Sequence, residues 1–110
     1  SSRSVVICGQ SIFAMVVETT LTKLSGVAVT RLDPRLPEVV DRIVGLTPDV
    51  VMIERGSGHG DLALALLGRG IPLFELDGER KQATALTGRR LPAVGIEDLA
   101  RMIEHLVSHR

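Results

Sequence analysis

The chain of 110 residues carries thirteen Lys and Arg side chains, thirteen Asp and Glu side chains and a single cysteine. With balanced charge, two Phe and no Trp or Tyr, it lacks the basic surface and stacking rings of nucleic-acid-binding proteins. The lone cysteine excludes an internal disulfide and a thiolate-rich metal site, and it fits a reducing compartment. Because 45% of the residues are hydrophobic, we expect one globular domain over residues 1–110.

The sequence contains no apolar run that approaches the length of a membrane span. Its opening, Ser1-Ser2-Arg3-Ser4, leads into a strand-like segment rather than into the apolar core of a signal peptide. We therefore expect a cytoplasmic protein whose partners include neither membranes nor nucleic acid.

The first strand and helix are predicted from a change in hydrophobic period. Val5–Cys8 is a short β-branched run that stops at Gly9, and Ser11 stands where a helix N-cap is expected. The residues that follow at helical spacing are Phe13, Val16, Val17, Thr20, Leu21 and Leu24. Gly26 is predicted to end this helix in a left-handed conformation, and Val27–Leu32 is the second predicted strand.

The next helix must end before Pro48, because the residue that precedes a proline disfavours helical backbone. Its apolar residues at helical spacing are Val39, Val40, Ile43 and Leu46. Asp49–Glu54 is apolar on both faces, which is typical of a central strand in a parallel sheet. A loop at Gly56–Gly60 then precedes a short helix capped by Asp61 and a fourth strand over Ile71–Leu76.

Three successive βα units predict an α/β protein with a mainly parallel, five-stranded sheet and helices on both faces, a three-layer α/β/α sandwich. Between Asp77 and Val94 the sequence lacks a helical pattern, so we expect a β-hairpin in place of a fourth helix. In this hairpin Gln82–Leu86 returns antiparallel to the fourth strand as the edge strand of the sheet. A last helix is predicted to begin near Gly95 or Ile96.

The order of these elements, with Thr47-Pro48-Asp49-Val50-Val51-Met52-Ile53-Glu54 leading out of the third strand, resembles the receiver domain of two-component response regulators. The resemblance covers roughly residues 4–77 and recurs at Gly95-Ile96-Glu97-Asp98-Leu99. It implies a flavodoxin-like sheet. It also implies an acid-lined Mg²⁺ site at the carboxyl ends of the strands, where a carboxylate attacks a phosphoryl donor.

The residues at the matching positions depart from that chemistry. The acidic pair of receivers falls on Gly9 and Gln10, neither of which supplies the negative charge that Mg²⁺ requires. The phosphoacceptor position falls on Glu54, whose extra methylene displaces the carboxylate. The Ser or Thr after the fourth strand falls on Asp77, and the phosphate-binding Lys has no counterpart, the nearest residue being Pro92.

We therefore predict a pseudo-receiver, a receiver-like domain that lacks the phosphorylation site. Its expected role is a non-catalytic module of signal transduction that acts through protein contacts, with no cofactor and no metal. The partner is an unidentified protein, with a second copy of the chain as one candidate. In this hypothesis Glu54 mimics the phosphorylated acceptor through its negative charge.

Cys8 carries the alternative hypothesis, a phosphocarrier or thiol enzyme. Cys8, followed by Gly9-Gln10-Ser11 and a helix N-terminus, resembles the phosphocysteine loop of phosphotransferase-system IIB domains. That loop usually has a further glycine where Ile12 or Phe13 stands in this chain. A lone cysteine that ends an apolar strand is more often a small buried hydrophobic residue, which is the interpretation we prefer.

The glycine-rich loop before the third helix is a weaker candidate. Its backbone would cradle an anion or serve only as a connector, and the glycines concerned are Gly56, Gly58 and Gly60. Acids and a histidine gather around the same loop, but such a set is common on protein surfaces and predicts no metal site: Glu54, His59 and Asp61.

Positive charge around the predicted hairpin has two possible functions. It forms a surface that binds an acidic partner, or it protects an exposed strand edge from unwanted pairing. The residues are Arg80, Lys81, Arg89 and Arg90. Because like charges disfavour pairing at that edge, a dimer is expected to use the first and last helices instead. The candidate residues for such a contact are Met15, Thr19, Met102 and Leu106. In the alternative interpretation, which we prefer, these residues only complete the core of one copy.

Overall fold

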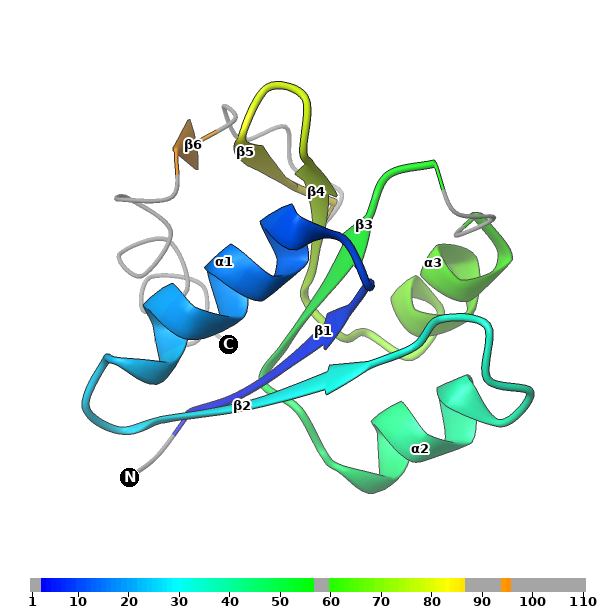
Figure 1. Cartoon of the computed structure of the whole chain (residues 1–110). Coiled ribbons are helices and arrows are strands. Elements are labelled where there is room, and N and C mark those ends of the chain that lie inside the picture. Colours follow the sequence, from blue (N-terminus) through cyan, green and yellow to red (C-terminus); the bar gives the residue numbers. More distant parts are fainter. Residues whose placement is uncertain (1–2, 57–59, 87–93, 96–110) are drawn as a thin grey trace.

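The computed structural model describes residues 3–56, 60–86 and 94–95, which form an α/β fold around one mixed sheet (Figure 1). In chain order the elements are β1 (Arg3–Cys8), α1 (Ile12–Thr22), β2 (Val27–Leu32), α2 (Val39–Gly45), β3 (Val50–Glu54), α3 (Gly60–Leu67), β4 (Leu73–Asp77), β5 (Gln82–Ala85) and β6 (Val94–Gly95). No helix among the described residues is long and apolar enough to cross a membrane.

The sheet has the strand order β2-β1-β3-β4-β5-β6. Strands β2, β1, β3 and β4 run parallel, which confirms the predicted parallel body of the sheet. Strand β5 returns antiparallel to β4 as expected for a hairpin, and the two strands are joined by a turn over residues 78–81. No helix is inserted at that point of the chain.

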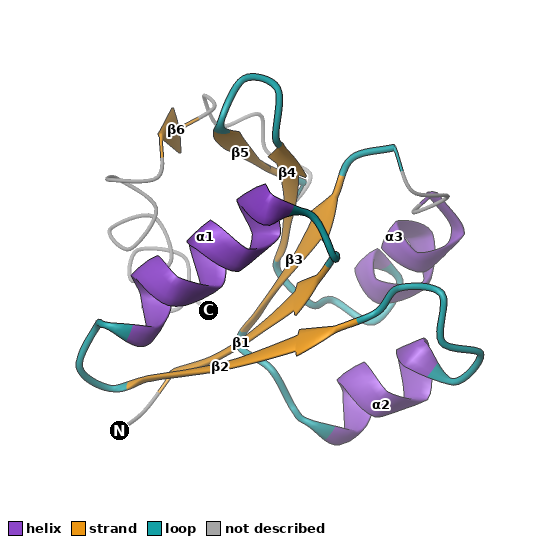
Figure 2. Cartoon of the chain, viewed as in Figure 1, coloured by secondary structure: helices purple, strands orange, loops and turns teal. Residues whose placement is uncertain are grey.

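Helices cover both faces of the sheet (Figure 2). The α1 face is filled by side chains of α1 and of alternate strand residues, including Val5, Val17 and Phe74. The opposite face is covered by α2 and α3, whose Ile43 and Leu66 pack against the other set of alternate strand residues. This three-layer packing agrees with the period-two alternation of the strands and the apolar stripes of the helices.

Local sequence accounts for the start and the end of α1. The Ser11 hydroxyl accepts a hydrogen bond from the Ala14 N–H at 3.1 Å and so caps the helix as predicted. Gly26 has φ of +78°, the left-handed conformation expected of a glycine after the helix end. Strand β2 then covers the predicted residues, Val27–Leu32.

The prediction of the edge strand is wrong, and one of the two predicted starts of the last helix is excluded. Strand β5 is not the edge strand, because β6 pairs antiparallel with it through Gln82 and Gly95. Gly95 therefore lies in a strand and does not begin a helix. Two residues carry no hydrophobic period, so backbone pairing alone reveals β6. Pro92, Ile96 and the remainder of the predicted last helix lie outside the described residues.

Helix α3 also begins earlier than predicted. It starts at Gly60, so Asp61 lies in the first turn, where its negative charge is favourable, rather than at the cap.

Candidate functional site

The carboxyl ends of β1, β3 and β4 lie at one margin of the sheet and frame the candidate site (Figure 1). Strands β1 and β3 are neighbours, yet the helices that follow them cover opposite faces. Such a point in a parallel sheet leaves a crevice outside the strand ends. An open depression of about 740 Å³ lies here, lined by Ser11, Ile12, Phe13, Glu54, Arg55, Gly56, Asp77, Gly78, Glu79 and Arg80.

Glu54, at the position matched to the phosphoacceptor, is bonded to the start of α1. Its Oε1 accepts a hydrogen bond from the Ser11 N–H at 2.9 Å, and its side chain is half-buried. A Cβ on the buried residue Gly9 would overlap the Oε1 and Cγ of Glu54. The missing side chain at position 9 thus leaves the space that the longer acid at position 54 fills, and the carboxylate adds favourable negative charge at the helix N-terminus.

Gln10, the second residue of the matched acidic pair, is bonded to an arginine. The Nη1 atom of Arg31, on β2, donates to the Gln10 Oε1 at 2.8 Å and to the Gly9 carbonyl at 3.3 Å. The Nε atom of Arg31 donates to the Glu18 carboxylate of α1 at 3.0 Å. This guanidinium therefore ties β2 to the β1–α1 loop and to α1. Sequence analysis missed it, although an arginine within a strand of otherwise uncharged residues was a visible signal.

Asp77, matched to the Ser or Thr of receivers, holds the turn of the β4–β5 hairpin. Its Oδ1 accepts the N–H groups of Glu79 at 3.0 Å and of Arg80 at 3.2 Å. Its Oδ2 lies 3.5 Å from the Arg55 Nη1 and 3.9 Å from the Arg80 Nε. The side chain of Asp77 is 18% exposed, whereas that of Arg55 is 62% exposed and that of Arg80 is 75% exposed. The two arginines thus present positive charge at the depression.

Cys8 lies away from the depression, inside the core. Its side chain has no exposed surface and packs among the apolar residues on the α2 and α3 side of the sheet. Burial raises the pKa of the Cys8 thiol to about 12. Because the thiolate is the nucleophilic form, this environment argues against a catalytic cysteine.

The glycine-rich loop is described only in part. Gly56 has φ of +93° and lines the depression, Gly60 is the first residue of α3, and Gly58 lies outside the described residues. Within residues 3–56, 60–86 and 94–95, no three His, Cys, Asp or Glu side chains are grouped as ligands of a metal ion.

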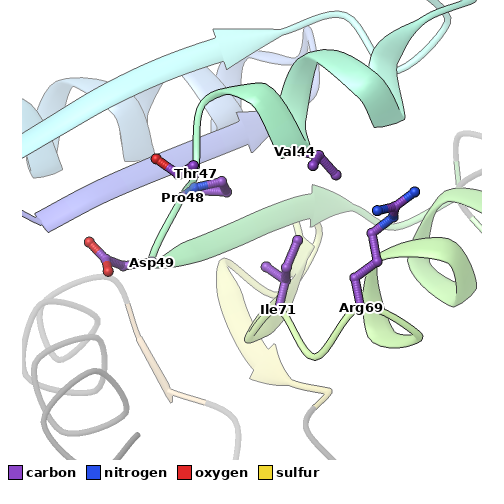
Figure 3. Close-up of a pocket in the computed structure, with 6 residues that line it drawn as sticks. All are labelled: Val44, Thr47, Pro48, Asp49, Arg69 and Ile71. Atoms are coloured by element: carbon purple, nitrogen blue, oxygen red, sulfur yellow. The ribbon is translucent and has the colours of Figure 1, made fainter.

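A second depression, of about 330 Å³, lies at the opposite end of the sheet (Figure 3). Its lining residues are Val44, Thr47, Pro48, Asp49, Arg69 and Ile71. The Asp49 Oδ2 accepts the Ser4 N–H at 2.8 Å, and the Asp49 N–H donates to the Ser4 carbonyl at 2.8 Å. Here the carboxylate joins the start of β3 to β1, which is a structural use of the acid that precedes the third strand.

Comparisons of the chain with family models, with curated proteins and with solved structures find no match. The function is therefore inferred from the geometry of the site. Two of the carboxylates that line the depression, those of Glu54 and Asp77, accept backbone N–H groups, and Cys8 lies outside it in the core.

Proposed function

We propose that this domain is a receiver-like regulatory module that works without phosphorylation and acts through contacts with another protein. Its strand order β2-β1-β3-β4-β5 is that of flavodoxin-like sheets, to which receiver domains belong. The antiparallel β5 in place of a fourth crossover helix is this chain's own variation.

The observation that carries the proposal is the hydrogen bond from the Ser11 N–H to the Glu54 carboxylate, which lies against Gly9. In a receiver the acceptor carboxylate must be free to attack a phosphoryl donor beside a metal-bound acidic pair. In this chain the carboxylate at that position already serves as an acceptor for the α1 N-terminus. The acidic pair is replaced by Gly9 and by a glutamine whose amide oxygen is held by Arg31.

In this proposal Glu54 does permanently what phosphorylation does transiently. It places negative charge at the end of β3 and links that strand to α1, two elements that are far apart in the sequence. The surface beside this link suits a protein partner, because Ile12, which is 81% exposed, lines the same depression as the exposed Arg55.

Acetyl phosphate tests the proposal directly. The wild-type chain and the Glu54→Gln variant are incubated with acetyl phosphate and Mg²⁺, and their intact masses are measured at intervals. We expect neither protein to gain a phosphoryl group. A phosphoryl adduct on the wild type that is absent from Glu54→Gln would overturn the proposal, since Glu54 would then be a working acceptor.

The thiol alternative is separated by the reactivity of Cys8. We expect the folded chain to react slowly with iodoacetamide at pH 7 and the urea-unfolded chain to react at the rate of an ordinary thiol, because burial raises the pKa of Cys8 to about 12. Rapid alkylation of the folded chain would favour the enzyme or phosphocarrier hypothesis.

A further inference from the structure

Among the described residues, strand β2 is an edge strand of the sheet, with β1 as its only neighbour (Figure 1). The Arg3 N–H donates to the Gly26 carbonyl and the Gly9 N–H to the Leu32 carbonyl, and Ser4 is paired with Ala28. Backbone groups alternate between the two sides of a strand in a parallel ladder. The N–H and C=O groups of Ala28 and Thr30 therefore face β1, and those of Val27, Val29 and Arg31 face away from the sheet.

Two features that commonly prevent strand pairing, proline and lysine, are absent from this edge. Val27–Leu32 contains no proline and no lysine, and all six residues keep an uninterrupted register with β1. Its single charged side chain, Arg31, is directed to Glu18 and Gln10 by hydrogen bonds. Three of the six residues are β-branched, a composition that favours pairing with a further strand.

We propose that β2 pairs antiparallel with β2 of a second copy of this chain, around a twofold axis at Val29, so that two sheets become one. In this register Val29 lies opposite Val29 of the second copy and Val27 lies opposite Arg31. Each of these residues exchanges both of its backbone hydrogen bonds with the residue opposite. Ala28 lies opposite Thr30 on the other face of the joined sheet.

A second copy fits this edge because the register is self-complementary. No like charges face each other, since the arginine of one copy lies opposite a valine of the other. The chain has a formal net charge of zero, so two copies do not repel each other as a whole. Met15, which is 46% exposed, lies one helical turn before Glu18, the partner of Arg31, and is an exposed apolar side chain on α1.

Hydrogen exchange and light scattering test this pairing on the 110-residue chain. We expect a reversible dimer with a dissociation constant below about 1 mM. As dimer forms, the amides of Val27, Val29 and Arg31 should gain protection from exchange. The amides of Ala28 and Thr30, which bond to β1, serve as the internal control and should be protected at every concentration.

Two double variants at exposed or half-buried positions on one strand face then test the register. Ala28→Lys/Thr30→Lys places lysines opposite each other across the axis, and we expect the dissociation constant to rise about tenfold or more. Ala28→Lys/Thr30→Glu places a lysine opposite a glutamate and should restore the dimer. Both variants change the same two residues, and circular dichroism shows whether each one is folded. A folding defect is therefore not mistaken for a loss of dimer affinity.

A monomer at all concentrations up to about 1 mM would overturn the proposal. So would a dimer in which the amides of Val27, Val29 and Arg31 still exchange freely, because another surface would then form the contact. Equal dimer affinity of the two double variants would contradict the register.

Discussion

The β2–β1 side of the sheet and the β4–β5 hairpin use their charged side chains in different ways. On the β2–β1 side Arg31 forms hydrogen bonds with Gln10 and Glu18, residues that are distant in the sequence. The other five residues of β2 are uncharged. In the hairpin Asp77 bonds to N–H groups two and three residues later, and Arg80 and Lys81 stand exposed in the turn.

Charged side chains therefore stabilise this fold in two ways, through contacts between residues distant in the sequence and through contacts within a turn. Bonds between distant residues hold the β1–α1 loop and the end of β3 together, and they leave the β2 edge free to pair. Hydrogen bonds within the turn hold the β4–β5 hairpin, where Arg80 and Lys81 are exposed, and β5 is paired on its other side with the short strand β6. The β2 edge and the β4–β5 hairpin therefore lie on opposite sides of one sheet.

Proline substitution on β2 gives the largest expected effect on this comparison. Ala28→Pro removes an N–H that faces β1 and leaves the β1 carbonyl that accepts it without this partner, so we expect the free energy of unfolding to fall by about 3 kcal/mol. Val29→Pro removes an N–H that faces away from β1, and we expect a loss of about 1 kcal/mol from altered packing. Urea unfolding of both variants measures the difference.

The same pair of prolines also reports on assembly. Val29→Pro should fold and remain monomeric at concentrations where the wild type is a dimer. Equal losses of stability in the two variants would mean that both sides of β2 are paired within one copy. Strand β2 would then not be an unpaired edge strand.

Gly9→Ala tests the long-range side of the comparison. The added methyl group overlaps the side chain of Glu54, so we expect a loss of about 2 kcal/mol in the free energy of unfolding. Glu54→Ala alone should cost about 1 kcal/mol through the lost bond to Ser11. In the double variant the methyl group has room, and most of the Gly9→Ala loss should disappear.

A double-mutant cycle from urea unfolding gives the coupling between the two sites. Additive losses would show that the cost of Gly9→Ala does not come from overlap with the Glu54 side chain. The close approach of Glu54 to Gly9 would then not explain why position 9 has no acid.

Local signals in the sequence predict most of the fold. Strand β2 is bounded by Gly26 on one side and by Asp33-Pro34 on the other, and its predicted and observed residues agree. The Ser11 cap and the hairpin after β4 are likewise set by residues close in the sequence. Strand β6 is missed because pairing of two residues depends on a partner strand and leaves no pattern of its own.

The candidate site is predictable in position but not in its contacts. Matching to a receiver places Gly9, Glu54 and Asp77 at one end of the sheet, and the structure does bring Gly9 and Glu54 together. The contact of Glu54 with Gly9 and its hydrogen bond to the start of α1 depend on the direction of the Glu54 side chain. Its partner Ser11 is 43 residues away in the sequence, so no local pattern predicts the contact. The role of Arg31 depends on three elements meeting, which no single segment reveals.

Substitution of Asp77 gives the smallest expected effect, because its contacts are local and its arginine partners are largely exposed. Asp77→Asn keeps an oxygen that accepts the N–H groups of Glu79 and Arg80, so only the attraction to the two arginines is lost. We expect a cost of about 0.5 kcal/mol at low salt, falling toward zero in about 1 M NaCl.

Asp77→Ala removes the turn bonds as well, and we expect a cost of about 1 kcal/mol that persists in high salt, because hydrogen bonds within a turn are not screened as exposed ion pairs are. Urea unfolding of both variants at two salt concentrations separates the two contributions. If Asp77→Asn were as costly as Gly9→Ala and insensitive to salt, the hairpin would depend on its carboxylate as strongly as the β1–α1 loop depends on Glu54. The contrast between local and long-range use of charge would then fail.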